Sequence, residues 1–240
     1  MSHAPAIDTS FETARTPALF DWTLVVALAA VVATAIRAIY FTPIEARQGA
    51  AQKILYVHAT SAFTALYLAF ALMAVASAVY LWLRDERLDR LAESSAEVGL
   101  MFTTIVLVTG PLWGRTIWGA WWTWDARLTS TLFLWFLIVG YLVLRGAVEE
   151  RGMRARYSAV LALMAAVLIP FIHLSVYMFR TLHPMPIVLK PGEPSMPVEM
   201  QHTFFMAFGA MALLYIALLR ARYRLATFRD RIDDADGGVA

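Results

Sequence analysis

The sequence predicts an all-α integral membrane protein, a helix bundle with six transmembrane helices and both the N and C termini in the cytoplasm. Of its 240 residues, 60% are hydrophobic and only 16% are charged, whereas a soluble domain has about 25% charged residues. The mean hydropathy is +0.62. No boundary in the sequence divides the chain, so we expect a single membrane domain over residues 1–240.

Six apolar segments reach the length of roughly 20 residues that crosses the hydrocarbon core of a bilayer. In chain order they are Leu19–Phe41, Ile54–Leu83, Ala96–Leu112, Leu128–Leu144, Tyr157–Phe179 and His202–Arg220. The first follows a polar N-terminal stretch. The second is long enough to tilt or to extend beyond the bilayer. The third is short, and we expect it to end at Gly110 and Pro111, because proline cannot continue a regular helix.

The last three segments are bounded by polar or proline-rich sequence. Asp125 lies three residues before the fourth segment, where an aspartate caps a helix N-terminus. The connection between the fifth and sixth segments, residues 181–200, contains five prolines and is expected to be extended. We expect residues 1–16 and 229–240 to be flexible tails.

The distribution of Lys and Arg between the segments predicts their orientation. One side of the membrane has thirteen: Arg15, Arg84, Arg87, Arg90, Arg145, Arg151, Arg154, Arg156, Arg220, Arg222, Arg224, Arg229 and Arg231. The other side has six: Arg47, Lys53, Arg115, Arg127, Arg180 and Lys190. The richer side faces the cytoplasm, so residues 113–127 face outward. Membrane topology therefore explains the pI near 9.0, and we expect no nucleic-acid partner.

Residues 113–127 are expected to form an outward loop rich in tryptophan. Five of the eight tryptophans of the chain lie here: Trp113, Trp118, Trp121, Trp122 and Trp124. One interpretation is an aromatic belt at the membrane interface, although a belt is spread over all helix ends. The other is a ligand platform, because aromatic rings stack on large planar molecules, and each stack contributes about 0.5–1.5 kcal/mol beyond the buried area.

The spacing within this loop favours a single aromatic face. If the loop is helical, four residues fall on one side of it: Trp118, Trp121, Trp122 and Asp125. Such a short helix would lie on the membrane surface. Arg115 lies among the tryptophans and Arg127 follows them, and guanidinium groups are suited to the two carboxylates of a porphyrin.

Two of the five histidines lie at the membrane level of the tryptophans. His58 is about one turn into the second segment from its outer end, and His183 lies just beyond the outer end of the fifth. Neutral imidazole nitrogens on both faces of a flat ring are what a six-coordinate haem iron needs. His173 is about 15 Å deeper and more typical of a hydrogen-bonded group between helices. His202 is interpreted as interfacial, and His3 belongs to the N-terminal tail.

Several sequence motifs are missing from the chain. It has no cysteine, so disulfides, thiolate metal sites and the C-x-x-C-H attachment site of c-type haem are excluded. It also lacks a G-x-x-x-x-G-K-[ST] loop. We therefore expect a binding protein rather than an enzyme, with any ATP hydrolysis performed by a partner subunit.

The same residues resemble a known family. The run WGRTIWGAWWTWDARLT, residues 113–129, looks like the tryptophan-rich WWD motif of haem-handling membrane proteins. Six spans in 240 residues, together with the flanking segments YVHATSA and RTLHP, most resemble the haem exporter protein C (CcmC) family of the cytochrome c maturation system. The resemblance covers the chain from the first to the sixth segment. Relatives of the CcmF and CcsA types share the motif but usually have more spans.

This resemblance implies a protein of the bacterial inner (cytoplasmic) membrane that holds haem b on the periplasmic side. Such a protein presents the haem to the haem chaperone CcmE, and it works with the subunits CcmA, CcmB and CcmD in an ABC-type complex. By position, His58 and His183 match the two axial ligands of the haem iron. The tryptophan loop, with Asp125, matches the haem platform. Residues 177–179, Tyr-Met-Phe, stand where the family pattern is expected to be rich in tryptophan.

Two other functions remain open from the residues alone. An integral b-type cytochrome that exchanges electrons with quinone would require His173 to bind a deeper haem. A permease-type transport subunit would use intramembrane polar residues such as Arg37 and His173, with the helix break at Gly110 and Pro111.

Overall fold

A computed structural model describes residues 21–185 and 196–237, and over these residues the fold is entirely helical. An isolated bridge between Glu45 and Gly49 is the sole β-type pairing within that part of the chain. Six helical segments are long and apolar enough to cross a membrane, which confirms the predicted fold class. The expected N-terminal tail, residues 1–16, lies outside the described residues.

The six spans are built from regular helices and short irregular turns. The first span is α1 (Trp22–Ile36) with a π-helical end, η1 (Arg37–Phe41). The second comprises η2 (Ala50–Ile54), α2 (Leu55–Phe63), the π-helical η3 (Thr64–Ala69) and α3 (Phe70–Leu83). The third and fourth are α4 (Glu86–Trp118) and α5 (Ala126–Ala147). The fifth comprises α6 (Arg151–Ala166) and α7 (Leu168–Met178), and the sixth is α8 (Val198–Gly237).

Acidic N-caps start four of these helices. Asp21 accepts a hydrogen bond from the Thr23 backbone N–H at the start of α1, and Asp85 accepts one from the Arg87 backbone N–H at the start of α4. Asp125 caps α5 and Glu150 caps α6. Each cap satisfies a backbone donor that has no partner inside its helix and places a negative charge at the positive end of the helix dipole.

The third span differs from its predicted bounds. The prediction that it ends at Gly110 and Pro111 is wrong, because α4 continues through Pro111 to Trp118. Proline is tolerated inside membrane-spanning helices, where neighbouring groups can satisfy the backbone carbonyl that it frees. The helix ends at Gly119, whose φ of 75° lies in the left-handed region that favours glycine.

The C-terminal helix also extends further than expected. We expected a flexible tail from residue 229, but α8 remains helical to Gly237. Ion pairs with other spans hold this extension: Asp230 pairs with Arg90 at 2.8 Å, and Asp234 pairs with Arg151 at 2.6 Å.

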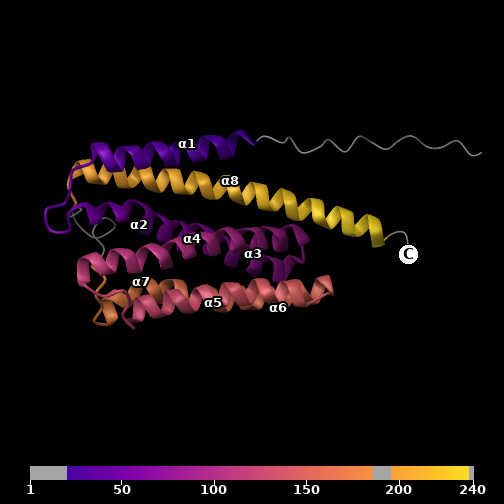
Figure 1. Cartoon of the computed structure of the whole chain (residues 1–240). Helices are drawn as coiled ribbons and strands as arrows, with labels where there is room; N and C mark the ends of the chain where they lie inside the picture. Colours follow the sequence, from indigo (N-terminus) through magenta and orange to yellow (C-terminus); the bar gives the residue numbers. More distant parts are fainter. Residues whose placement is uncertain (1–20, 186–195, 238–240) are drawn as a thin grey trace, which may run out of the picture.

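The described parts of the three connections that were predicted to face outward lie at one end of the bundle (Figure 1). This end, called the outer end below, comprises residues 42–49, residues 119–125 and residues 179–185. The short turns at 84–85 and 148–150 lie at the opposite, inner end, and α8 runs beside α1 (Figure 1).

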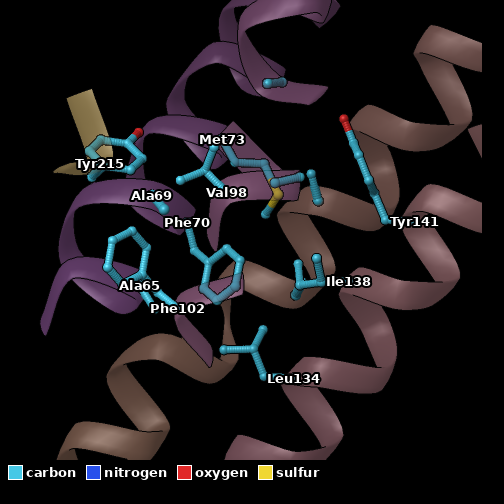
Figure 2. Close-up of a cluster of buried hydrophobic side chains, with 14 of the residues drawn as sticks. Ala65, Ala69, Phe70, Met73, Val98, Phe102, Leu134, Ile138, Tyr141 and Tyr215 are labelled. Carbon is cyan, nitrogen blue, oxygen red and sulfur yellow. The ribbon is translucent and has the colours of Figure 1, made fainter. Parts of the chain in front are cut away.

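A hydrophobic core fills the middle of the bundle (Figure 2). Phe70, Phe102 and Leu134 come from three different spans and are fully buried. Small residues allow the helices to approach closely, as is usual between membrane helices. A Cβ added at Gly99 would lie only 2.5 Å from the Phe70 ring. The middle of the bundle is thus closely packed, and the main cavity lies toward the outer end.

Candidate functional site

A cavity of about 740 Å³ opens at the outer end of the bundle. This volume lies within the range of small-molecule and cofactor sites, about 300–1,000 Å³. Its walls come from α2, α4, α5, α7 and α8 and from the outer loops. Six of the ten residues that were predicted from the sequence line it: His58, His183, Trp113, Trp118, Trp122 and Arg127. His58 and His183 therefore converge on one space, although His58 lies on the second span and His183 lies in the segment after the fifth.

His58 projects from α2 toward α4. Its Nδ1 lies 3.0 Å from the hydroxyl oxygen of Thr109, and its ring meets Trp113 edge-on at 5.7 Å. The Thr109 hydroxyl donates its hydrogen to the carbonyl oxygen of Ile105 at 2.7 Å, so it accepts the hydrogen bond from His58 Nδ1–H. This arrangement leaves the lone pair on Nε2, as in metal-binding histidines whose other nitrogen is held by a neighbouring group.

Gly110 makes room for this ring. A Cβ at Gly110 would lie 3.2 Å from Cε1 of His58, closer than ordinary van der Waals contact. Thr109 and Gly110 therefore act together: one orients the imidazole and the other allows it to approach α4.

His183 lies just after α7, and its backbone N–H donates to the Thr181 hydroxyl at 3.1 Å. Its ring is 5.5 Å from the Trp118 ring. Its Nδ1 lies 3.9 Å from the nearer carboxylate oxygen of Asp125, beyond hydrogen-bond distance, and is buried with no partner among the described residues. A buried polar atom without a partner carries a desolvation cost of about 1–3 kcal/mol, which a ligand or a small rotation of the ring would remove.

Asp125 has two structural roles. One carboxylate oxygen caps α5 by accepting from the Leu128 N–H at 2.9 Å, as predicted, and the other accepts from the Thr181 hydroxyl at 2.8 Å. Burial alone would raise the pKa of Asp125, but the neighbouring His183 ring, the Leu128 N–H and the Thr181 hydroxyl together hold that pKa well below its usual range. The charged carboxylate thus joins the tryptophan loop to the segment that carries His183.

The tryptophans do not form the expected helical face. Trp113 and Trp118 lie in the last turns of α4, and residues 119–125 are not helical, because Gly119 ends the helix. Trp122 reaches the cavity from this loop, and Trp121 lines a smaller recess beside both histidines. Trp124 does not line the cavity; it is 77% exposed and meets Trp122 edge-on at 5.7 Å.

The two predicted arginines occupy different places. Arg127 lines the cavity and donates hydrogen bonds to the backbone carbonyls of Ile172 and His173, at 3.2 and 3.3 Å. Arg115 donates to the carbonyl of Gly119 at the end of α4 and is not among the cavity-lining residues. Both arginines lie close to the tryptophans in the sequence, but in the folded protein only Arg127 lines the cavity.

Several residues of the site were missed in the sequence. Gly110 was interpreted only as part of a helix break, Thr109 was not singled out, and Thr181 carried no signal beyond its closeness to His183. His173 was expected to make a hydrogen bond between helices, and it does so with the hydroxyl of Tyr67 at 2.6 Å. Both of these residues also line the cavity. His202 is exposed outside it, and His3 lies outside the described residues.

Comparison with known proteins gives one consistent result. The family model described as "Heme exporter protein C" matches residues 3–236. A heme exporter protein C of Haemophilus influenzae is 35% identical over 190 residues, which cover 79% of this chain and 77% of that protein. One from Escherichia coli is 40% identical over 143 residues, 60% of this chain and 58% of that protein. One from Rhodobacter capsulatus is 30% identical over 207 residues, 86% and 85% of the two chains.

Proposed function

The chain belongs to the haem exporter protein C family, and from this premise we propose that it binds haem b in the outer cavity, with His58 and His183 as axial ligands of the iron. Membership of the family implies a role in cytochrome c maturation. The observation that carries the proposal is that both imidazoles line one cavity together with Trp113 and Trp118.

The two imidazoles fit this role by their local chemistry. The Thr109 hydroxyl leaves Nε2 of His58 with a free lone pair, and Nδ1 of His183 is buried without a partner among the described residues. An iron porphyrin brings four equatorial nitrogens of its own, so it needs only two axial ligands from the protein. His58 of the second span and His183 of the segment after the fifth supply that number.

The aromatic rings of the cavity and one arginine fit the porphyrin ring and its carboxylates. Trp113 packs beside His58 and Trp118 beside His183, so each proposed ligand has an apolar ring next to it. Arg127 has five N–H donors, and two of them donate hydrogen bonds to backbone carbonyls. Its remaining donors are available to a porphyrin carboxylate in the cavity. Arg115, outside the cavity lining, is not part of this contact.

We also propose that the exposed tryptophans present the site to the haem chaperone CcmE. Trp121 and Trp124 are 58% and 77% exposed at the outer end, and exposed tryptophans are frequent centres of protein–protein interfaces. An interfacial belt that contacts membrane lipid is the alternative role for these two rings. The inner end carries most of the arginines, which supports a periplasmic outer end, and the partners CcmA, CcmB and CcmD belong to the same proposal.

The test is spectroscopic. Full-length protein purified with haem should show the spectrum of a six-coordinate, bis-imidazole haem, and His58→Ala or His183→Ala should remove it. His202→Ala is the matched control, because His202 is an outer-end histidine away from the cavity. Loss of the spectrum only with His173→Ala would instead favour a b-type cytochrome. A protein that never binds haem would favour a permease-type subunit.

A further inference from the structure

The cavity continues past the two proposed ligands to a deeper pair, Tyr67 and His173. Tyr67 follows His58 by nine residues, which corresponds to about 13 Å along a helix. Tyr67, His173 and Arg127 line the same cavity as His58 and His183. The cavity therefore contains two levels of chemically suited side chains, an outer one and an inner one, with no wall between them.

The deeper pair, Tyr67 and His173, already holds its two side chains in contact. The Tyr67 hydroxyl lies 2.6 Å from Nδ1 of His173, and the two rings meet edge-on with centroids 6.1 Å apart. Arg127 donates to the backbone carbonyl of this same histidine at 3.3 Å, and it makes no ion pair with any carboxylate in the described parts of the chain. A phenol, an imidazole and an unpaired guanidinium thus share one corner of a membrane-embedded cavity.

Two interruptions of regular helix geometry place this pair. Tyr67 lies within the π-helical turn η3, and π-helical turns are rare and frequent at functional sites. His173 lies in α7, after the break that separates α7 from α6 at Val167. Tyr67 is also 39% exposed, so its ring is not a core residue that packing alone explains.

We propose that Tyr67 and His173 form a second, inner site for the iron porphyrin, in which the Tyr67 oxygen binds ferric iron. This inference rests on the proposed function, because it assigns the same cargo to a second position in the same cavity. Tyrosine is an established type of axial ligand for ferric haem. In the step, the bond between the Tyr67 oxygen and its hydrogen breaks, an iron–oxygen bond forms, and the proton moves to Nδ1 of His173. No electron is transferred.

The two levels would then act in sequence. Release from the inner site returns the proton from His173 to the Tyr67 oxygen, and the imidazoles of His58 and His183 take over the iron. Arg127 extends from the start of α5 at the outer end to the carbonyl of His173. Its guanidinium is therefore within reach of a porphyrin carboxylate at either level.

The experiment uses full-length protein in detergent, with ferric haem added to the purified apo form. In the His58→Ala/His183→Ala double variant, we expect a high-spin ferric spectrum with the tyrosinate vibrations of resonance Raman spectroscopy. Adding Tyr67→Phe should abolish those vibrations and weaken haem binding by about tenfold, equivalent to 1.4 kcal/mol. Tyr157→Phe is the matched control, because Tyr157 is an exposed tyrosine of α6 outside the cavity. His173→Ala should weaken the same signature.

The outcomes separate the two proposals. If haem in the double variant has the same spectrum and affinity with Tyr67→Phe as with Tyr157→Phe, the inner site is refuted, while a bis-imidazole spectrum in the unmodified protein keeps the proposed function intact. If the double variant still shows the bis-imidazole spectrum of the unmodified protein, the proposed function fails. Should the double variant not fold, His183→Ala alone carries the same comparison, since one missing imidazole already removes the six-coordinate outer site.

Discussion

The two ends of the bundle place their buried polar groups in different surroundings. At the inner end, Arg145 is buried and forms hydrogen bonds to both carboxylate oxygens of Asp89, at 2.7 and 2.8 Å, and to Glu93 at 2.9 Å. At the outer end, Nδ1 of His183 and Nε1 of Trp122 are buried without partners among the described residues. Both ends contain buried nitrogens without a hydrogen bond in the part of the chain that the structure describes, and Nε of Arg145 is one of them. The difference is that the guanidinium of Arg145 is paired with two carboxylates, whereas His183 and Trp122 line the cavity.

This difference indicates which end serves stability and which serves binding. A buried ion pair contributes little over an apolar pair, but removing one partner leaves an uncompensated charge and is strongly destabilising. A buried nitrogen without a hydrogen bond points to a binding site where its residue also lines a cavity, because a ligand there can restore the bond, and this holds for His183 and Trp122. Substitutions at the inner end should unfold the protein, and those at the outer end should release its cargo.

The largest expected effect is at the inner end. Arg145→Ala leaves Asp89 and Glu93 facing a buried space without their cation, and we expect a loss of about 3–5 kcal/mol in the free energy of unfolding. Thermal or denaturant unfolding in detergent measures this loss. Arg156→Ala is the control, because Arg156 is an exposed inner-end arginine. Equal stability of the two variants would contradict the assigned role of the ion pairs.

At the outer end, the strongest effect short of removing a ligand is expected from Thr109→Val. This nearly isosteric change removes the oxygen that accepts from Nδ1–H of His58, and loss of such a supporting partner lowers metal affinity by about 10–100-fold. Haem affinity should fall by that amount, while the free energy of unfolding should change little. Thr116→Val, on the same helix but outside the cavity lining, should leave haem affinity unchanged. A similar loss in both variants would show that the effect comes from α4 itself.

A smaller effect is expected from the tryptophans, and it should depend on their position. Trp118→Ala removes the ring beside His183, and we expect haem affinity to fall by about tenfold or less, given about 0.5–1.5 kcal/mol for one aromatic stack. Trp124→Ala removes an exposed ring and should leave haem binding intact while slowing transfer to CcmE. Equal haem loss in the two variants would reject the distinction between cavity and surface tryptophans.

The smallest effect is expected from Asp125→Asn, because asparagine is as good an N-cap as aspartate. At neutral pH we expect a loss of less than about 1 kcal/mol in unfolding free energy. The folded-state pKa of Asp125 is depressed below the unfolded value of about 3.9. Its carboxylate therefore stabilises the fold above that value, and this contribution is lost as the pH falls through the folded pKa. The difference between the two proteins should shrink below about pH 4; a constant difference would mean that the charge is irrelevant.

Much of the fold could be predicted, because hydropathy depends on each segment alone. All six predicted spans correspond to helical segments of the structure. The errors lie at helix ends, where neighbours decide the outcome. Pro111 was expected to end a helix that continues past it, and Gly119 was not recognised as the residue that ends it. The predicted tryptophan face was wrong for the same reason.

The site was only partly predictable, because convergence between spans leaves no mark in the spacing of residues. His58 and His183 could be assigned to the same membrane level, but not to the same cavity. The contact of Thr109 with His58 could not be predicted, because it depends on how α4 packs against α2. The inner-end pairs were missed as well, because arginines such as Arg145 and Arg222 were already explained by membrane orientation. Arg222 is in fact hydrogen-bonded to Glu97 of α4.

The sixth span has a mechanical consequence. α8 is one uninterrupted helix of 40 residues, about 60 Å long. Met200 and Phe204 near its start form part of the cavity wall, and Asp230 near its end is anchored to Arg90. A tilt of so long a helix at its far end would displace the cavity wall at its near end. A force applied to the inner end of α8 would therefore act on the cavity without contact at any residue that lines it.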